Sequence, residues 1–390
     1  MLSLSWYGQE TVTGSGAPAS CKIPAPRRGY AMQTTIEAIK GALMRKRRKR
    51  KPRQELLSTG STALNLACSD RHDGAYVKGH YYYFVGDSQS GKTWLALSSF
   101  AELCRNPAFD DYQLVYDNAE DGALMDMRRF FGDKVADRLV PPAYDEEGRP
   151  VFSDTAESFY YHVADAAARG PCFYVLDSMD ALQTCDDKAK FEEHKKAWEE
   201  GKEAKGSYGM AKAKINSTHL REALRACRDT GSILIIISQT RDNVGFGFET
   251  RTRGGGRALT FYATLEIWTS VVGKITKTVN GKKRQLGVRV EARVKKNRVS
   301  GKDRMVEIPI YHSFGIDDVG ACVDYLIDEK RWKKKGQTIV ADDFDFQGSR
   351  DKLIRHIEEN DLETDLHDIM GTVWREIEEA CAIQRKRRYE

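Results

Sequence analysis

The sequence contains no apolar run long enough to cross a bilayer. Its longest purely aliphatic run is 233–237, whereas a membrane-spanning helix needs about 20 apolar residues. Residues 1–31 also lack the apolar core of a signal peptide and show no helical period, so we expect a disordered leader there. These absences predict a cytoplasmic protein without a membrane partner. Hydrophobic residues at 41% and charged residues at 31% exclude collagen-like and wholly disordered chains.

The sequence also lacks closely spaced cysteine pairs and a large net charge of either sign. The 8 cysteines include no C-x-x-C pair, which argues against a disulfide framework or a zinc site and indicates reduced thiols. The 62 Lys and Arg nearly balance the 57 Asp and Glu, for a net charge of +5. The protein as a whole is therefore not strongly basic, as a protein that coats nucleic acid through its overall charge would be. Attraction to phosphate must come from local clusters of basic residues.

The N-terminal region after the leader predicts a helix and a basic arm over 32–56. Met32 offers an alternative translation start, and apolar residues recur at helical spacing over 34–44. Basic residues then fill 45–53, apart from one proline. This run is either a phosphate-binding arm or a solvated linker.

Continuous apolar strands then alternate with helices, which predicts an α/β fold with a mainly parallel sheet covered on both faces. After residue 262 strands no longer alternate with helices. Two strand-like segments, 263–275 and 286–296, instead flank Asn280-Gly281, a sequence typical of a hairpin turn. Together with a strand at 304–311, they predict an antiparallel edge. The alternating strands are 81–85, 113–116, 172–176 and 232–238, and the helices 92–103, 121–131 and 211–227.

Two further segments stand apart from this alternation. Residues 186–205 are dense in Lys and Glu, with Phe191, His194 and Trp198 at helical spacing; we expect an exposed inserted helix with one packing stripe. After residue 349, two amphipathic patterns predict helices. We therefore divide the chain into a core over 57–335 and a small helical C-terminal module over 336–390.

A phosphate-binding loop follows the strand at 81–85. The segment matches G-x-x-x-x-G-K-T and leads directly into a helix, which is the context that a P-loop requires. Its backbone N–H groups would face the β-phosphate of ATP, Lys92 would neutralise the β- and γ-phosphates, and Thr93 would offer its hydroxyl to Mg²⁺. The nucleotide-binding residues are Gly86, Asp87, Ser88, Gln89, Ser90, Gly91, Lys92 and Thr93.

Carboxylates end two of the predicted strands. Asp177 follows the strand at 172–176 and is the expected Mg²⁺ partner, acting through water; the alternative is an Asp that caps a turn. Hydrolysis also needs a group that orients the attacking water. The strand at 113–116 ends in a run of acids, and the residues leave Asp117, Glu120 and Asp121 as candidates.

The loop at 241–257 combines arginines, phenylalanines and glycines. Arginines suit phosphates, and phenylalanines suit stacking on the bases of single-stranded DNA. Taken alone, the loop would be interpreted as a flexible surface segment with solvated arginines. Its position directly after Gln239 favours the DNA contact instead. The candidate DNA contacts are Arg241, Phe246, Phe248, Arg251, Arg253 and Arg257.

Three segments together resemble the RecA recombinase family. They are 57–61 with Leu64, followed by the P-loop; 176–182; and 238–241, with the glycine-rich stretch to Gly256 and the residues 258–263 after it. The resemblance covers about residues 57–335, and it is greatest to phage-encoded, UvsX-type members. It implies a RecA-like core and, if the chain is phage-encoded, a place in the bacterial host cytoplasm.

The resemblance also implies catalytic roles. It selects Glu120 as the group that activates water, although the alignment needs an insertion there, so Asp117 and Asp121 stay open. Gln239 is similar to glutamines that sense the γ-phosphate and begin a DNA-binding loop. Lys296 and Arg298 resemble a Lys-Asn-Lys segment whose cations reach the neighbouring subunit's ATP; Arg298 departs from that lysine but keeps the charge. The family's other DNA loop would fall near 206–210, after the inserted helix.

These features predict a DNA-dependent ATPase that requires Mg²⁺. We expect a recombinase that forms a helical filament on single-stranded DNA and pairs it with double-stranded DNA during strand exchange. The alternative is a RecA-fold motor or regulatory ATPase, such as a ring-shaped helicase, without strand exchange. A DNA-binding adaptor with residual nucleotide binding is the third reading, against which Lys92, Thr93 and Asp177 weigh.

Overall fold

The computed structural model describes residues 55–120, 125–201, 211–242 and 251–386. The predicted leader, helix and basic run up to residue 54 lie outside this part, as do Asp121 and 206–210. Within the described part, no helix is both long and apolar enough to cross a membrane.

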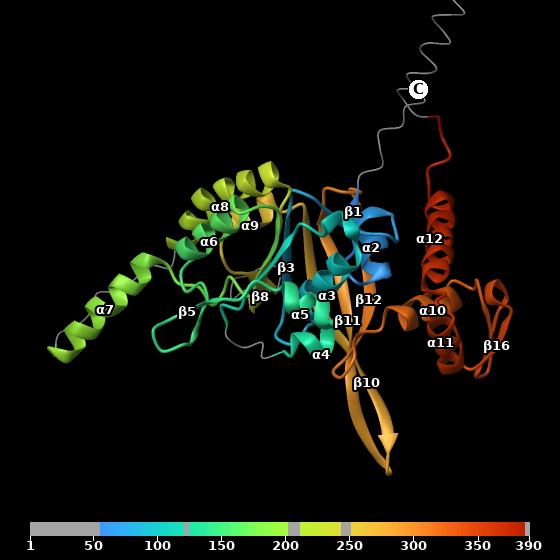
Figure 1. Ribbon diagram of the computed structural model, residues 1–390. Coiled ribbons are helices and arrows are strands. Elements are labelled where there is room, and N and C mark those ends of the chain that lie inside the picture. Colours follow the sequence, from blue (N-terminus) through green and yellow to red (C-terminus); the bar gives the residue numbers. More distant parts are fainter. Residues whose placement is uncertain (1–54, 121–124, 202–210, 243–250, 387–390) are drawn as a thin grey trace, which may run out of the picture. The chain divides into compact units, whose positions relative to one another are not determined.

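A nine-stranded sheet forms the centre of the described unit (Figure 1). Its order is β13-β12-β11-β10-β3-β8-β7-β4, with β9 paired to β8. Strands β10, β3, β8, β7 and β4 are parallel, whereas β11, β12 and β13 continue the sheet in antiparallel fashion. This confirms the predicted fold class. The bounds are β3 Tyr81–Gly86, β4 Gln113–Asp117, β7 Cys172–Leu176, β8 Ile233–Asp242, β9 Arg251–Arg253, β10 Leu265–Val279, β11 Lys282–Asn297, β12 Met305–Tyr311 and β13 Gly315–Ile316.

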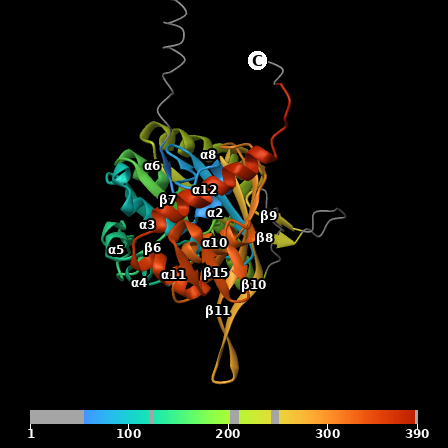
Figure 2. The ribbon, with the colours of Figure 1, turned by 90° about the vertical axis from the view of Figure 1, so that its right-hand side faces the viewer.

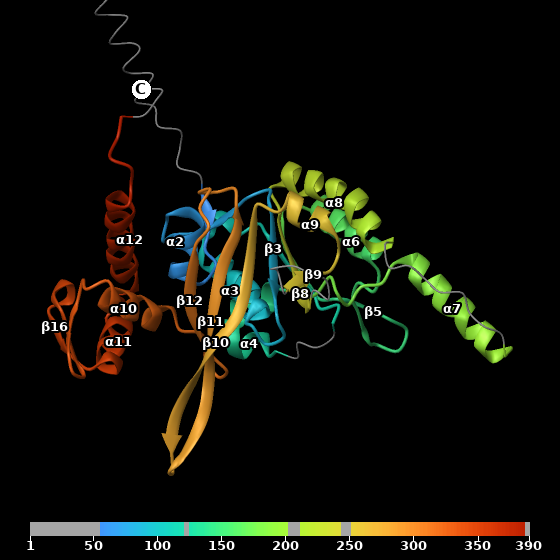
Figure 3. The same ribbon diagram turned by 180° about the vertical axis from the view of Figure 1, so that it is seen from behind.

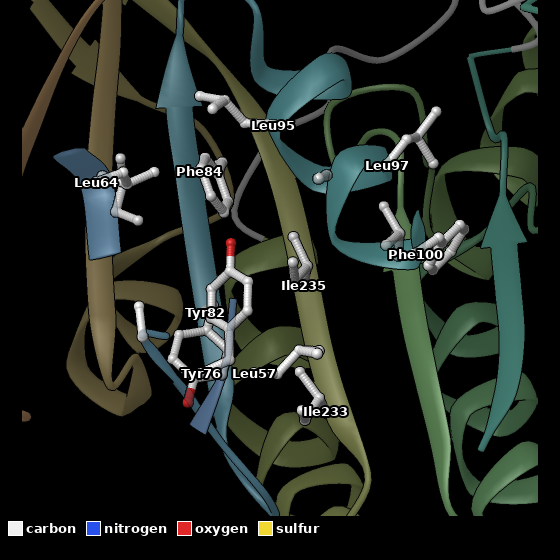
Figure 4. Close-up of a cluster of buried hydrophobic side chains, with 14 of the residues drawn as sticks. Leu57, Leu64, Tyr76, Tyr82, Phe84, Leu95, Leu97, Phe100, Ile233 and Ile235 are labelled. Atoms are coloured by element: carbon white, nitrogen blue, oxygen red, sulfur yellow. The ribbon is translucent and has the colours of Figure 1, made fainter. Parts of the chain in front are cut away.

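Both faces of the sheet are buried, as the continuous apolar strands predict. Along β3, Tyr82 and Phe84 face one hydrophobic cluster, while Tyr81, Tyr83 and Val85 face the other. Figure 4 shows the first cluster, in which these β3 side chains pack with leucines and Phe100 of α3 (Lys92–Arg105). The second cluster contains residues of α6 (Ala156–Ala168), α8 (Ala211–Thr230) and α9 (Arg257–Tyr262). Burial of each large apolar side chain stabilises the fold by about 1.5–3 kcal/mol.

Strand register brings the candidate site residues to one edge of the sheet. Gly86, at the end of β3, pairs with Gln239 of β8, and Asp117, at the end of β4, pairs with Leu176 of β7. Because parallel strands end at the same edge, the P-loop, Gln239 and Asp177 meet there. Ligands of open α/β sheets bind at this carboxyl edge.

The antiparallel part extends into a two-stranded arm. β10 pairs with β3 only over 265–269, and β11 pairs with β12 only over 287–293, so residues 270–286 have no further strand partner in the described sheet. Figures 1 and 3 show this arm leaving the sheet. The predicted hairpin turn is confirmed, with Asn280 and Gly281 both at positive φ. The arm carries no acidic residue and five basic ones: Lys274, Lys277, Lys282, Lys283 and Arg284.

The C-terminal region has its own hydrophobic cluster. It joins α10 (Asp318–Asp328), α11 (Arg350–Glu359) and α12 (Glu363–Ala380) to α2 (Thr62–Ser69). The sequence analysis missed its three-stranded sheet of β14 (Lys333–Lys335), β15 (Thr338–Ala341) and β16 (Phe346–Gly348). The boundary at residue 335 stays a prediction, because α10 packs on both β12 and α12.

Two helix predictions need correction. The helix expected over 121–131 begins only at Met127, because Asp126 caps α4 (Met127–Phe131) with its side chain. The inserted helix is α7 (Cys185–Glu199), and its expected packing stripe is wrong: Phe191 and Trp198 are 64% and 79% exposed. The other elements are β1 Leu56–Leu57, β2 Tyr76–Val77, η1 Pro107–Phe109, α5 Asp133–Arg138, β5 Ala143–Tyr144, β6 Pro150–Val151 and η2 Asp342–Phe344.

Candidate active site

The P-loop needs glycine at both of its ends. A Cβ at Gly86 would lie 2.3 Å from Thr269 Oγ1 and 2.5 Å from Ser90 Oγ, so no larger residue fits without displacement. Gly91 adopts a left-handed conformation with φ 82° directly before α3. The loop therefore curls onto the start of α3, whose unpaired N–H groups favour an anion.

Lys92 lies across this loop. Its Nζ donates to the carbonyl oxygens of Gly86 at 3.0 Å and Asp87 at 2.7 Å, and the residue is 8% exposed. Burial lowers the pKa of Lys92, which the negative charges of Asp177 and Glu120 partly offset. The ammonium is thus held where the loop would bind phosphate.

Thr93 and Asp177 meet at the base of the site. Thr93 Oγ1 donates to Asp177 Oδ2 at 2.7 Å, and the Tyr116 hydroxyl donates to the same oxygen at 3.2 Å. Burial raises the pKa of Asp177, although the hydrogen bond from Thr93 opposes the shift. A hydroxyl and a carboxylate form the hard oxygen donor set that Mg²⁺ prefers, so these residues fit the predicted ion.

A cavity of about 170 Å³ opens between these groups. Every residue of its lining is polar or charged, as binding of the triphosphate end of a nucleotide requires. It is formed by Ser88, Gln89, Lys92, Thr93, Asn118, Glu120, Asp177 and Gln239.

Two of the three candidate water-activating carboxylates can be compared. Asp117 is 4% exposed and accepts hydrogen bonds from Ser153 N at 2.9 Å and the Tyr174 hydroxyl at 2.7 Å. Those contacts direct it into the protein, and it does not line the cavity. Glu120 does line the cavity and accepts hydrogen bonds from the Ser178 hydroxyl and the Gln239 amide. The geometry supports Glu120.

Gln239 joins the cavity to the candidate DNA loop. Its Nε2 donates to Glu120 Oε1 at 2.9 Å, and its backbone N–H donates to Asp180 Oδ2 at 2.7 Å. The candidate DNA loop begins two residues later, at Arg241 within β8, and its residues 251–253 form β9, which pairs with the end of β8 (Figure 2). Arg241, Arg251 and Arg253 belong to this ribbon and Arg257 starts α9, whereas Phe246 and Phe248 lie outside the described residues.

Lys296 and Arg298 do not enter the cavity of their own chain. Lys296 Nζ donates to the carbonyls of Thr260 at 2.5 Å and Phe261 at 2.7 Å, and Arg298 Nη2 donates to Phe261 O at 2.8 Å. Both therefore cap the C-terminus of α9. Glu266 of β10 pairs with Lys296 on one side and with Tyr83 of β3 on the other. Lys296 therefore lies level with Tyr83, which precedes Gly86 in β3, and not level with the P-loop.

Sequence reasoning missed several residues around the site. Asn118 lines the cavity, and the Tyr116 hydroxyl donates to Asp177. Ser178 contacts Glu120, and Asp180 accepts a hydrogen bond from the backbone of Gln239 near the end of β8. Their only sequence signal is position, since each lies at or just beyond the end of a predicted strand.

Comparisons with known proteins agree on one family. The RecA N-terminal domain family matches residues 193–317. Protein RecA of Lactiplantibacillus pentosus is 26% identical over 368 residues, which is 92% of this chain and 86% of that protein. Protein RecA of Corynebacterium efficiens is 28% identical over 300 residues, or 76% and 69% of the two chains. Protein RecA of Nostoc punctiforme is 28% identical over 326 residues, or 82% and 80%.

Proposed function

We propose that this chain, which belongs to the RecA family, is an ATP-dependent DNA recombinase that assembles on single-stranded DNA and promotes homologous pairing. One observation carries the proposal: Gln239, whose side chain lines the cavity, lies in β8 two residues before Arg241, where the candidate DNA loop begins. We further propose that it is a phage-encoded, UvsX-type member acting in the bacterial host cytoplasm, on the resemblance of its motifs.

ATP with Mg²⁺ would supply the phosphoryl group and the charge compensation for its transfer. Lys92 would leave the carbonyls of Gly86 and Asp87 to bind the β- and γ-phosphate oxygens. Thr93 Oγ1 would bind the ion directly, and Asp177 would bind it through water. Glu120 would orient the attacking water with a carboxylate oxygen and accept its proton.

The positions of Lys296 and Arg298 support a subunit interface at the nucleotide. Arg298 is exposed, and both cations lie away from their own P-loop beside the exposed Phe261. In a helical filament, they would approach the phosphates of the neighbouring subunit's ATP and stabilise charge that develops there. Sites shared between subunits would make hydrolysis depend on assembly.

Basic residues in two segments support the DNA partners. The ribbon of β8 and β9 with its loop would hold single-stranded DNA through arginines and phenylalanines. The β10–β11 arm presents five cations without an acidic residue, which suits the phosphate backbone of a duplex partner.

A strand-exchange assay tests the proposal. With circular single-stranded DNA, homologous linear duplex and ATP, the protein should form joint molecules, and Lys92→Ala should not. Electron microscopy with single-stranded DNA and a slowly hydrolysed ATP analogue should show helical filaments. Closed rings without joint molecules would instead support the ring-shaped motor.

A further inference from the structure

A second connection links the P-loop to the DNA loop. Asp87, the residue after Gly86, accepts a hydrogen bond at Oδ1 from the hydroxyl of Thr240, which directly precedes Arg241. The two residues meet because Gly86 and Gln239 are paired between β3 and β8. The nucleotide-binding loop therefore contacts the residue that directly precedes the 241–257 loop, and this contact does not involve the side chain of Gln239.

Asp87 also contacts the lysine that would bind phosphate. Lys92 Nζ lies 2.7 Å from the carbonyl oxygen of Asp87. Phosphates entering the cavity would draw Lys92 away from that carbonyl and bring negative charge towards the Asp87 carboxylate. Both changes disfavour the present position of Asp87, since like charges repel and the lysine contact is lost. The contact between Asp87 and Thr240 would therefore weaken when nucleotide binds.

The neighbouring residues of β8 are anchored differently. Asp180 Oδ2 accepts hydrogen bonds from Ser238 Oγ at 2.5 Å and from Gln239 N at 2.7 Å. Asp180 does not line the cavity, so nucleotide would leave this anchor in place. Beyond the side chain of Gln239, which lines the cavity, Thr240 is the next residue of the strand end whose contact would change when nucleotide binds.

We propose that Asp87 and Thr240 are positioning residues that hold the DNA loop in a low-affinity arrangement until nucleotide binds. The proposal rests on the proposed function, because it assumes that the 241–257 loop binds DNA. It assigns two opposing contacts to the strand end: Gln239 favours the DNA-binding arrangement when nucleotide is present, and Thr240 opposes it when nucleotide is absent. A ligand shifts such an equilibrium only through different affinities for the two arrangements.

The test compares Thr240→Val, which keeps the β-branched shape but loses the hydroxyl, with Thr240→Ser, which keeps the hydroxyl. Affinity for labelled single-stranded DNA is measured with and without a slowly hydrolysed ATP analogue, and analogue affinity is measured without DNA. Thr240→Val should bind DNA about 3- to 10-fold more tightly without nucleotide, the range expected for one lost hydrogen bond. With the analogue present, its DNA affinity should equal that of the wild type.

Linkage adds a result that a merely structural role would not give. Because DNA and nucleotide favour the same arrangement, Thr240→Val should also bind the analogue more tightly without DNA, by the same factor. Thr240→Ser should behave as the wild type. Ser238→Ala, which loses a contact to Asp180 on the same strand end, is the matched control and should not gain nucleotide-free DNA affinity.

Two failures can be told apart. If the analogue does not raise the DNA affinity of the wild type, the proposed function is wrong. If it does, but Thr240→Val gains neither DNA nor analogue affinity, the role of Asp87 and Thr240 is wrong. The double variant Asp87→Ala, Thr240→Val should gain no more nucleotide-free DNA affinity than Thr240→Val alone, since each substitution removes the same hydrogen bond between Asp87 and Thr240. Additive gains from the two substitutions would overturn the proposed pairing.

Discussion

Gln239 and Glu120, which are 119 positions apart, share a hydrogen bond in which Nε2 donates to Oε1 at 2.9 Å. Both side chains line the cavity formed by Lys92, Thr93 and Asp177. The residue that would orient water thus contacts the residue that leads into the candidate DNA loop. Hydrolysis and DNA binding would share this contact, so each is expected to depend on the other.

Separate replacement of Glu120 and Asp117 should show that one carboxylate serves catalysis and the other stability. Glu120→Gln should keep nucleotide binding but lower hydrolysis by about 10²- to 10⁴-fold, because the amide is a poor proton acceptor. Asp117→Asn should instead lower the free energy of unfolding by about 1–3 kcal/mol, because it disturbs a buried hydrogen-bonded acceptor. Single-turnover hydrolysis and urea unfolding measure the two effects. Normal hydrolysis by Glu120→Gln, with loss in Asp117→Asn, would move the base to Asp117.

Mixing experiments test the intersubunit roles of Lys296 and Arg298. A Lys92→Ala chain and a Lys296→Ala, Arg298→Ala chain should each be inactive alone. Mixed assemblies contain some interfaces with one complete site, so the mixture should recover part of the DNA-stimulated ATPase activity. If mixed assemblies form but remain as inactive as either variant, these cations do not act on a neighbour's nucleotide.

The ion pair between His367 of α12 and Asp318 of α10 should stabilise the fold less as the pH rises above ~6.5. Burial lowers the pKa of His367, but the hydrogen bond and charge of Asp318, which lies at 3.1 Å, together with the charges of Glu102 and Glu363, outweigh this effect, and the net shift is upward. A histidine with a raised pKa stabilises the fold fully below its unfolded value of about 6.5, and this stability is lost as pH rises through the folded value. The free energy of unfolding should therefore fall above pH ~6.5. His367→Gln should remove that part of the pH dependence in chemical denaturation; an unchanged profile would exclude this ion pair.

The arginines and phenylalanines of the candidate DNA loop should differ in their salt response. Arg257→Ala should reduce the slope of log affinity against log salt by about 0.7 for single-stranded DNA. Phe248→Ala should weaken binding by about 1–3 kcal/mol with little change in slope, because stacking releases no counterions. Fluorescence anisotropy across a salt series distinguishes them. Unchanged affinity after joint replacement of Phe248, Arg251 and Arg253 would move the contact to the basic run 45–53.

The core was predictable because local signals agree with the fold. The apolar strand at 81–85, the glycines at 86 and 91 and the helix after them specify one phosphate-binding turn, and the Asn280-Gly281 turn specifies the hairpin. The small sheet of β14, β15 and β16 was missed because its strands are short and β14 consists of three exposed lysines. It is stabilised by packing beside Trp332 and Ile339 in the C-terminal cluster, which a strand pattern does not show.

The site was predictable only where residue type and position coincide. Lys92, Thr93 and Asp177 follow from motif and strand end. Glu120 was selected only by resemblance, with Asp117 and Asp121 left open. The fold adds that hydrogen bonds from Ser153 and Tyr174 direct the buried Asp117 away from the cavity. The contact between Asp87 and Thr240 depends on the pairing of β3 with β8, and neither residue is unusual in sequence.

The most direct test of the account is ATP hydrolysis measured with and without single-stranded DNA in three proteins: the wild type, Lys92→Ala and Gln239→Ala. DNA should stimulate hydrolysis in the wild type, Lys92→Ala should be inactive in both conditions, and Gln239→Ala should bind nucleotide but lose the stimulation. Equal hydrolysis by the wild type with and without DNA, or full stimulation in Gln239→Ala, would contradict the coupling of the cavity to the DNA loop.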